Sequence, residues 1–285
     1  MPPQKVHCRR VTVDGYSVHY REATGDGQGP PVLLIHGWPT SSFLWRNIMP
    51  AIAEHRRVLA IDLPGLGESD KPLDITYDLE FYKNIIDGFL EAVGAGDKVA
   101  LGVHDMGGPI GLYWASQRSD RLERLAVLNT LLYPELSWAV RAFLFGIKIP
   151  GLGALASSRW GLSMSMRVGV DDSSRLRPDT IEGVCAPFPD RASRRALVQT
   201  IRQLPLSGLD VIAEWLPTVT TPVKAVYGAN DRILPRIEQT VERLCEDVPQ
   251  TDVVRIDDCG HFLQEDRPEI VAKALAEFFS SPTGH

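Results

Sequence analysis

Short apolar runs that alternate with helix-like segments, and that break off once, constrain the fold of this chain more than any other feature. The runs cover residues 32–35, 58–61, 99–103, 125–128, 223–227 and 253–256. Because the first four are apolar throughout rather than at every second position, they predict strands buried on both faces, as in a parallel sheet covered by helices. Helical spacing of apolar residues follows several of these runs, and a last helix is predicted over residues 268–279.

The interruption lies between residues 134 and 216, where no strand-like run occurs. This stretch carries helical fragments that are broken by glycine and proline, together with several aromatic residues. Long segments inserted into a compact domain usually serve a function. The sequence therefore predicts a sheet domain made of residues 1–133 and 217–285, with residues 134–216 forming an inserted helical cap, or lid.

The N-terminal part of the chain predicts one antiparallel feature. Two alternating segments, residues 10–13 and 17–20, are joined through Asp14-Gly15, a dipeptide typical of tight hairpin turns. The expected fold class is therefore α/β: a mostly parallel central sheet with an N-terminal hairpin, helices on both faces and the helical lid. A chain of 285 residues is long enough for one large domain with such an insertion.

The charge balance excludes some classes of partner. The chain has 30 Lys and Arg against 36 Asp and Glu, a net charge of −6, and no block of basic residues. Nucleic-acid binding depends on clustered positive charge, so no nucleic-acid partner is expected, and an anionic lipid surface is an equally poor match. No apolar run reaches the ~18 residues of a spanning helix, so no membrane partner is expected.

The N-terminus and the cysteines bear on location and metal binding. The first ten residues hold no apolar stretch like that of a signal peptide, so the expected location is cytoplasmic. The cysteines Cys8, Cys185, Cys245 and Cys259 are widely scattered and predict reduced thiols. No close set of cysteine, histidine and acidic ligands occurs, so no metal is expected.

The motif HDMGG (residues 104–108) follows the run 99–103 directly and leads into a predicted helix. A strand that turns sharply into a helix through glycines is the layout of a nucleophile elbow, which exposes one side chain at the edge of a sheet. The elbow position usually holds serine, and here it holds Asp105. Taken alone, Asp105 is explained equally well as an aspartate that caps the N-terminus of the helix.

Two further polar residues follow predicted strands. Asp231 comes just after the run 223–227, and His261 comes after the run 253–256. Side chains at the carboxyl ends of parallel strands gather at one edge of a sheet, and the order nucleophile, acid, histidine matches the triad of folds with an elbow. We therefore predict Asp105 as the nucleophile, Asp231 as the residue that orients the histidine, and His261 as the general base. A lone histidine would more often be structural.

The motif HGWP (residues 36–39) follows the run 32–35. In a fold with a nucleophile elbow, this loop and the residue after the nucleophile each supply a backbone N–H to the oxyanion hole. Those donors are predicted to be the N–H groups of Trp38 and Met106. The plainer interpretation of HGWP is an ordinary turn at the exit of a strand.

Four motifs carry a resemblance to a known family: HGWPTSSFLWRNIMP (36–50), IDLPGLGESDKP (61–72), VHDMGG (103–108) and GHFLQEDRPE (260–269). The chain resembles the α/β-hydrolases, and among them the haloalkane dehalogenases and epoxide hydrolases that use aspartate as nucleophile. PTSSFLWR is most similar to the dehalogenases, and Asn129-Thr130 resembles the branch that places its acid after a later strand, in agreement with Asp231. The resemblance implies a small apolar substrate, water as co-substrate, and no cofactor.

An aspartate nucleophile implies a particular reaction. A carboxylate displaces a leaving group from saturated carbon and becomes an ester of Asp105. His261 then activates a water that attacks the ester, and the oxyanion forms between the two N–H donors. We expect a hydrolase most similar to a haloalkane dehalogenase, which cleaves carbon–halogen bonds. An ordinary esterase or lactonase is disfavoured, because Asp105 provides no hydroxyl nucleophile.

The chain departs from the dehalogenase pattern where the halide would bind. Dehalogenases usually carry donor side chains at the positions of Trp38 and Met106, and the Met106 side chain has no donor. The candidates that could bind a leaving group are then the indoles of Trp38, Trp138, Trp160 and Trp215. Hydrophobic packing is the plainer explanation for each tryptophan of the lid.

Two alternatives stay open. An epoxide hydrolase needs an acid for the alkoxide, and relatives of that kind use tyrosines of the lid. Residues 134–216 hold no tyrosine or histidine, which leaves Tyr133 at the boundary as the substitute. A more distant alternative is a catalytically lapsed protein that keeps the fold as a ligand pocket. The retention of Asp105, Asp231 and His261 together argues against that interpretation.

Overall fold

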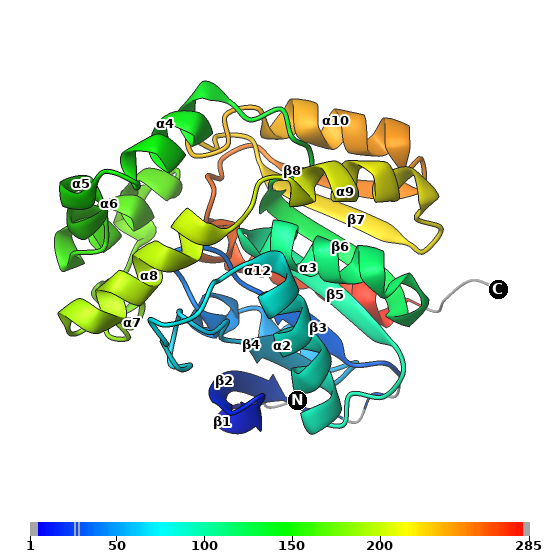
Figure 1. Ribbon diagram of the computed structural model, residues 1–285. Coiled ribbons are helices and arrows are strands. Elements are labelled where there is room, and N and C mark those ends of the chain that lie inside the picture. The colour runs from blue at the N-terminus through cyan, green and yellow to red at the C-terminus, as the bar shows by residue number, and fades with distance from the viewer. Residues whose placement is uncertain (1–4, 26, 28, 282–285) are drawn as a thin grey trace.

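The computed structural model describes residues 5–25, 27 and 29–281, with one eight-stranded sheet at the centre (Figure 1). The strands lie in the order β1-β2-β4-β3-β5-β6-β7-β8. Their bounds are β1 Val6–Val13, β2 Tyr16–Ala23, β3 Val32–Ile35, β4 Val58–Ile61, β5 Val99–Asp105, β6 Leu122–Thr130, β7 Val223–Gly228 and β8 Thr251–Ile256. Every run that the sequence predicts as a strand is a strand here, and β3 and β4 have the predicted bounds.

The first two strands form the predicted hairpin. β1 pairs antiparallel with β2 around Asp14 and Gly15, whose φ angles of 49° and 84° are those of a tight turn with left-handed residues. β2 also pairs antiparallel with β4, and the pairs among β3 to β8 are parallel. The predicted α/β class, a mostly parallel sheet with an N-terminal hairpin, is confirmed.

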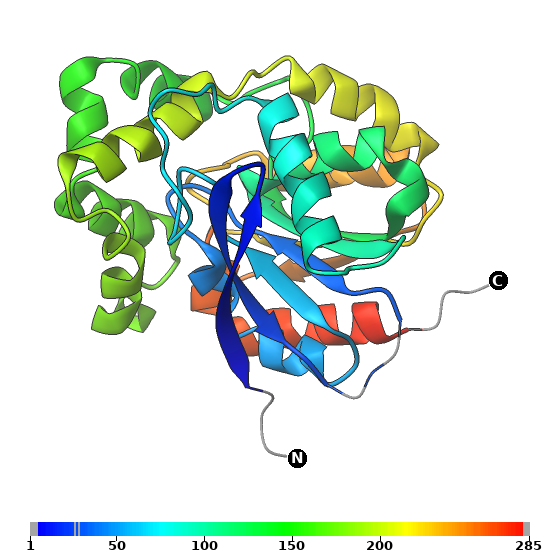
Figure 2. The ribbon, with the colours of Figure 1, turned by 60° about the horizontal axis from the view of Figure 1, so that its bottom comes forward.

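Helices cover both faces of the sheet. Successive residues of a strand point to opposite faces, so a strand that is apolar at every position presents an apolar surface on each face. Leu33 and Ile35 of β3 join one apolar cluster, and Val32 and Leu34 join another. The first cluster includes residues of α2 Leu79–Ala92, α3 Gly107–Gln117, α9 Gly208–Trp215 and α10 Ile237–Asp247, and the second includes residues of α1 Met49–Ala53, α11 Leu263–Asp266 and α12 Pro268–Ser280. Figure 2 shows α12, in red, on the opposite side of the sheet from α2 and α3.

One predicted helix is split. The apolar spacing over residues 44–52 fits a single helix, but the structure has the 3₁₀ turn η1 Ser42–Trp45 followed by the short helix α1. The Ser41 hydroxyl caps η1, and Pro50 stands in the first turn of α1, where its missing N–H costs no hydrogen bond. The apolar side chains that produce this spacing are nevertheless buried: Leu44, Trp45, Ile48, Met49 and Ile52.

The segment predicted as a lid contains helices and no strand among its described residues (Figure 1). Its first five helices are α4 Trp138–Gly146, α5 Pro150–Ala156, α6 Arg159–Gly169, α7 Pro178–Cys185 and α8 Arg191–Gln203. They gather at one end of the sheet, and we call them the cap. The next helix, α9, instead packs against α3 on a face of the sheet. The boundaries at residues 134 and 216 stay a prediction.

Several findings bear on thiols, membranes and metals. All four cysteines are free. Among residues 5–25, 27 and 29–281, no helix is both long and apolar enough to cross a bilayer. The same part of the chain holds no group of three or more histidine, cysteine or acidic side chains arranged to bind a metal ion. Residues 1–4, which belong to the stretch used to judge targeting, lie outside the described chain.

Candidate active site

Asp105 stands at a strained turn between a strand and a helix. It is the last residue of β5, and α3 begins at Gly107. Its φ angle of 51° lies in the left-handed region, which residues with a side chain adopt at a cost and which is found often at functional sites. This turn is the predicted elbow, and it places Asp105 in the lining of a cavity next to the cap.

The glycines after Asp105 allow the turn sterically. A Cβ atom on Gly107 would come within 2.5 Å of the His36 carbonyl oxygen, and one on Gly108 would overlap the Thr130 hydroxyl. That hydroxyl donates a 2.6 Å hydrogen bond to the Asp105 carbonyl oxygen. Glycine therefore lets α3 approach the neighbouring strands closely enough to hold the elbow from both sides.

Gly108→Ala is expected to destabilise the fold, because the added methyl group overlaps the buried Thr130 side chain. Overpacking of this kind costs about 1–3 kcal/mol, so the Tm measured by thermal unfolding should fall by several degrees. Gly151→Ala is the matched control, since a Cβ atom at Gly151 meets nothing within 4 Å. Equal Tm values for the wild type and Gly108→Ala would show that the elbow tolerates a side chain there.

Backbone N–H groups stabilise the Asp105 carboxylate. The Trp38 N–H donates to Asp105 Oδ1 at 2.7 Å, and the Met106 N–H helps to lower the pKa of the carboxyl. Gly37 leaves room for this approach, because a Cβ atom there would overlap Asp105 Oδ1. Burial raises the pKa of Asp105, but His261 and the N–H donors outweigh burial and bring that pKa below its ordinary value. The structure thus brings together an ionised carboxylate and the donors that the sequence predicts.

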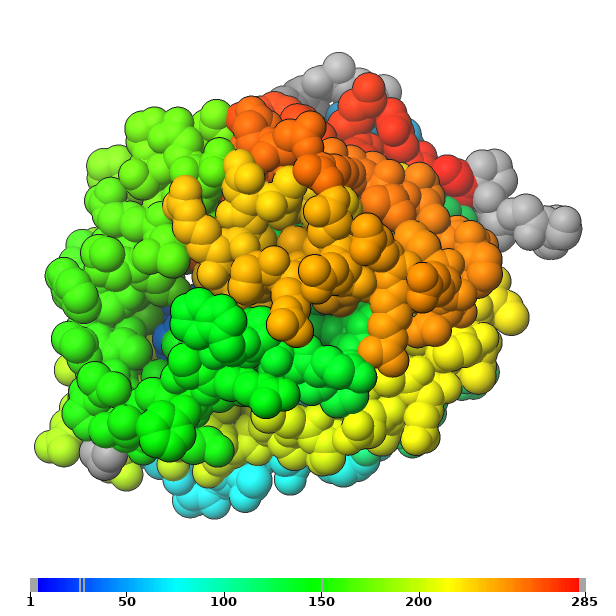
Figure 3. All heavy atoms as spheres, turned by 90° about the horizontal axis from the view of Figure 1, so that it is seen from above, coloured from blue at the N-terminus to red at the C-terminus, as the bar shows by residue number. Residues whose placement is uncertain are grey.

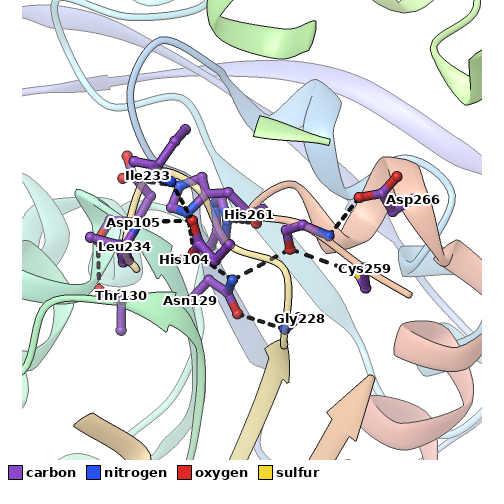
Figure 4. A network of polar contacts seen from close by, with 12 residues as sticks. His104, Asp105, Asn129, Thr130, Gly228, Ile233, Leu234, Cys259, His261 and Asp266 are labelled. Atoms are coloured by element: carbon purple, nitrogen blue, oxygen red, sulfur yellow. Dashed lines mark hydrogen bonds and ion pairs between the residues drawn. The ribbon is translucent and has the colours of Figure 1, made fainter. Parts of the chain in front are cut away.

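His261 lies between two carboxylates at the same edge of the sheet (Figure 4). Its Nδ1 is 2.8 Å from Asp231 Oδ2, and its Nε2 is 3.2 Å from Asp105 Oδ2, which is ion-pair distance without the alignment of a hydrogen bond. Burial lowers the pKa of His261, but the Asp231 and Asp105 carboxylates outweigh burial and raise the pKa to about 10. His261 therefore carries a proton at neutral pH.

Asp231 is fixed by donors on both of its oxygens. The N–H groups of Ile233 and Leu234 each donate to Oδ1 at 2.7 Å, and the Asn129 amide donates to Oδ2 at 2.6 Å. Burial raises the pKa of Asp231, but the charge of His261 and these hydrogen bonds bring the pKa below its ordinary value. An ionised Asp231 is therefore in place to orient His261 and to stabilise its positive charge.

Two residues beside Asp105, Asp231 and His261 have contacts that the sequence did not predict. Asn129 links Asp231 to β7, because its side-chain oxygen accepts the Gly228 N–H at 3.0 Å. His104 Nε2 is 2.9 Å from the His261 carbonyl oxygen, and burial and the neighbouring His261 lower the pKa of His104 to about 4. In the sequence, only their positions could have indicated these contacts: His104 directly precedes the elbow residue, and Asn129 stands near the end of a buried strand.

A cavity of about 500 Å³ lies between the sheet and the cap. Asp105 lines it together with apolar side chains of the cap, such as Phe143 and Leu155. Besides Asp105 and the indoles, the polar side chains in the described lining are Ser165 and Arg232. The space therefore suits a small apolar molecule that meets a single, partly buried carboxylate.

Two predicted donors for a leaving group are engaged elsewhere. The Trp38 indole N–H donates to the Leu197 carbonyl oxygen at 3.1 Å, and the Tyr133 hydroxyl donates to Asp247 Oδ2 at 2.7 Å. Contacts with α8 and α10 thus use both donors, and the predicted roles of the Trp38 side chain and of Tyr133 find no support in this geometry.

Of the other three tryptophans, only Trp160 belongs to the described lining of the cavity. Trp138 is 77% exposed and Trp215 packs against the core of the sheet domain, and neither lines the cavity, so the predictions for both are wrong. Trp160 does line the cavity, but it is 62% exposed, which places it at the opening. Among the described residues, the polar groups that contact Asp105 Oδ1 and Oδ2 are the N–H donors and His261.

Comparison with known proteins agrees with this geometry. Residues 30–143 match a family described as alpha/beta hydrolase fold. The haloalkane dehalogenase of Agrobacterium fabrum is 30% identical over 292 residues, which cover 96% of this chain and 92% of that protein. The cis-3-alkyl-4-alkyloxetan-2-one decarboxylase of Shewanella oneidensis is 29% identical over 289 residues, which cover 94% and 86%.

A solved structure shows that the similarity also holds for the three-dimensional fold. The epoxide hydrolase CorEH superposes with a TM-score of 0.80 at 26% identity, covering 97% of this chain and 99% of that one. The agreement spans the sheet and the cap, because nearly the whole of each chain is covered. The chain belongs to the α/β-hydrolase family and is related to haloalkane dehalogenases and epoxide hydrolases.

Proposed function

We propose that this hydrolase forms an ester between Asp105 and a saturated carbon of a small apolar substrate, and then hydrolyses that ester. The carboxylate itself carries the proposal: the Trp38 N–H donates to it, His261 Nε2 approaches it at 3.2 Å, and it lines an apolar cavity. A carboxylate so placed is a nucleophile for a carbon that bears a leaving group. Haloalkane dehalogenation is the activity that this arrangement supports best.

In the first half of the reaction, an oxygen of Asp105 bonds to the substrate carbon. The carbon–halogen bond breaks at the same time, and the halide takes the electron pair. The hydrogen bond from Trp38 to Oδ1 fixes the carboxylate, so the geometry of attack is set before the substrate arrives.

In the second half, water attacks the ester carbonyl carbon of Asp105, His261 takes a proton from that water, and the oxyanion forms between the N–H donors. Esterification removes the negative charge of Asp105, one of the charges that raise the pKa of His261. The pKa of His261 therefore falls when the ester forms, and the histidine loses its proton and becomes a base. The balance is R–X + H₂O → R–OH + H⁺ + X⁻.

The leaving group is the part of the substrate that the cavity constrains most. An epoxide opens to an alkoxide, which needs a proton donor, and the Tyr133 hydroxyl is bound to Asp247. A halide needs no proton, but the Met106 side chain offers it no hydrogen bond. Bromide and iodide, which leave more readily and are more weakly hydrated than chloride, fit such a site best.

Turnover is expected to fall in the order hexyl iodide, hexyl bromide, hexyl chloride, with little diol formed from hexene oxide. The physical reason is that the cavity stabilises a departing anion weakly and cannot protonate it. Ion chromatography of released halide and gas chromatography of the diol, on one enzyme preparation, measure the two activities. Diol formation without halide release would overturn dehalogenation in favour of epoxide hydrolysis.

Met106→Gln tests, with the same halide assay, whether the lack of a side-chain hydrogen-bond donor at residue 106 limits the release of chloride. Glutamine has nearly the shape of methionine and adds an amide N–H to the cavity lining. A hydrogen bond to an anion contributes about 1.5–3 kcal/mol, so kcat/KM for hexyl chloride should rise about tenfold or more. Met106→Leu, which adds no donor, is the control, and an equal rise in both variants would remove this explanation.

The lack of a proton donor also favours a second candidate, a strained lactone such as the oxetanone in the name of the Shewanella relative. Attack of Asp105 on the saturated ring carbon that is bonded to the ring oxygen would break that carbon–oxygen bond and release a carboxylate, which needs no proton. Loss of carbon dioxide would then expel Asp105 and leave an alkene, with no water consumed and no base required. Conversion of a dialkyl oxetanone by His261→Phe at the wild-type rate would distinguish this route from dehalogenation.

A further inference from the structure

The cap exposes several large apolar side chains. Trp138, Phe145 and Trp160 are 77%, 71% and 62% exposed. Leu152 and Leu155 are about half exposed and also line the cavity, so the apolar surface continues into it. Figure 3 shows a hollow among the green atoms of the cap. Exposed apolar side chains gathered in this way mark a contact surface.

The same part of the cap is basic. Residues 136–170 hold four basic residues and no acidic one, although the whole chain has a net charge of −6. The four are Arg141, Lys148, Arg159 and Arg167, and all are exposed. Within residues 136–170, the exposed apolar side chains are accompanied by basic charges alone, which is complementary to a partner that is both apolar and anionic.

A groove beside the cavity opening concentrates more positive charge. It lies between α8 and the α5–α6 junction and is lined by Arg159, Arg191, Arg194, Arg195 and Arg202. Within the described chain, the one ion pair recorded for these five arginines joins Arg159 to Glu182. Leu155 and Trp160 line the cavity while Ser158 and Arg159 line the groove, so segments around the α5–α6 junction contribute to both.

We propose that this face of the cap docks on an anionic phospholipid bilayer, with its apolar side chains in the acyl region and its arginines on the lipid phosphates. Aromatic and aliphatic residues flanked by Lys and Arg are typical of surfaces that lie in the membrane interface. Guanidinium groups match phosphate oxygens in geometry and charge. The cavity then opens toward the membrane and receives apolar substrates from it.

Docking of the cap on lipid goes beyond the proposed function and does not depend on the chemistry at Asp105. It revises the expectation, drawn from the net charge of −6, that anionic lipid is a poor match. Net charge is a property of the whole chain, whereas this face of the cap is basic. A second copy of the chain fits the face less well, because two such faces would bring like charges together.

Flotation of the full chain with phosphatidylcholine vesicles that contain or lack phosphatidylglycerol tests the docking. The wild type should float with the anionic vesicles, bind the neutral ones at least about tenfold more weakly, and be released by salt. Asp105→Asn should float like the wild type. The Asp105→Asn measurement therefore distinguishes a failure of docking from a failure of the proposed chemistry.

One pair of variants tests the apolar part of the surface. Trp138→Ala combined with Phe145→Ala removes two exposed side chains and should lower vesicle binding about tenfold or more. Val253→Ala combined with Ile270→Ala removes exposed apolar side chains of the sheet domain and is the matched control. The control pair should bind like the wild type.

A second pair tests the charge. Arg194→Gln combined with Arg195→Gln should weaken binding to anionic vesicles about tenfold or more, because each basic residue near the bilayer adds to the attraction. Lys98→Gln combined with Lys273→Gln removes the same charge from exposed positions of the sheet domain. That pair should bind like the wild type.

The proposal fails if the wild type stays unbound with both kinds of vesicle, or if neutral vesicles bind it as well as anionic ones. It also fails if the control pairs lower binding as much as the cap pairs do. Analytical ultracentrifugation supplies one more outcome. A dimer that Trp138→Ala with Phe145→Ala abolishes would mean that a second copy covers the surface, and lipid docking would be rejected.

Discussion

Asp105→Asn is expected to lower the turnover of hexyl bromide at least about 10⁴-fold, because removal of a nucleophile abolishes the covalent route. The backbone N–H groups of Trp38 and Met106 remain in this variant, but without a carboxylate no ester forms. Asp105→Ala serves as a second variant, because it cannot regain a carboxylate through hydrolysis of an amide. The measurement is halide release at saturating substrate, and wild-type turnover by Asp105→Ala would place the nucleophile elsewhere.

Asp105→Asn should also change the pKa of His261. The charge of Asp105 helps to raise the pKa of His261 to about 10, so this pKa should fall in Asp105→Asn, as measured by NMR titration of the imidazole. A raised pKa in the folded state means that protonated His261 stabilises the fold. This contribution is complete below the ordinary pKa of 6.5 and is lost as pH rises through about 10. Asp105→Asn should therefore lose less stability over that interval than the wild type.

His261→Phe is expected to stop the reaction halfway. Attack of Asp105 on the substrate carbon needs no base, so each active site should release one equivalent of halide. Hydrolysis of the ester does need a base, and loss of a general base costs about 10²–10⁴-fold. Rapid-quench measurement of halide should therefore show a burst followed by turnover reduced at least this much.

His55→Phe is the matched control for this burst, because His55 is exposed on the sheet domain. It should turn over at the wild-type rate. Undiminished turnover by His261→Phe would mean that another group activates the water. Loss of both the burst and the turnover in His261→Phe would mean that His261 acts before the ester forms.

The strands, and the edge of the sheet where Asp105, Asp231 and His261 meet, can be predicted from the sequence because their signals are local. The runs that become β3 and β4 are apolar at every position, and Asp14-Gly15 marks the hairpin turn within two residues. Asp105, Asp231 and His261 each come just after or at the end of a strand. A parallel sheet brings such positions to one edge, so the predicted strands were enough to place them together.

The leaving-group residues could not be predicted in this way, because distant segments use their donors. The Trp38 indole bonds to Leu197 of the cap, and the Tyr133 hydroxyl bonds to Asp247 of α10. Nothing in the sequence around Trp38 or Tyr133 indicates these partners. The packing of the cap against the sheet decides which donors stay free, and that packing is not a local property.

The charge of the cap is present in the sequence but is hidden by the net charge of the chain. Residues 136–170 hold four basic residues and no acidic one. The folding of α4 to α6 decides that these residues share an exposed surface with Trp138, Phe145 and Trp160. The composition of the whole chain therefore does not reveal that this stretch of the cap is basic.

The ester on Asp105 is tested most directly by the mass of His261→Phe after incubation with hexyl bromide. We expect the intact mass to increase by one hexyl group, and peptide mapping to place that group on Asp105. The double variant Asp105→Ala with His261→Phe should stay unmodified. An unmodified His261→Phe, or a hexyl group on any residue other than Asp105, would contradict the covalent mechanism.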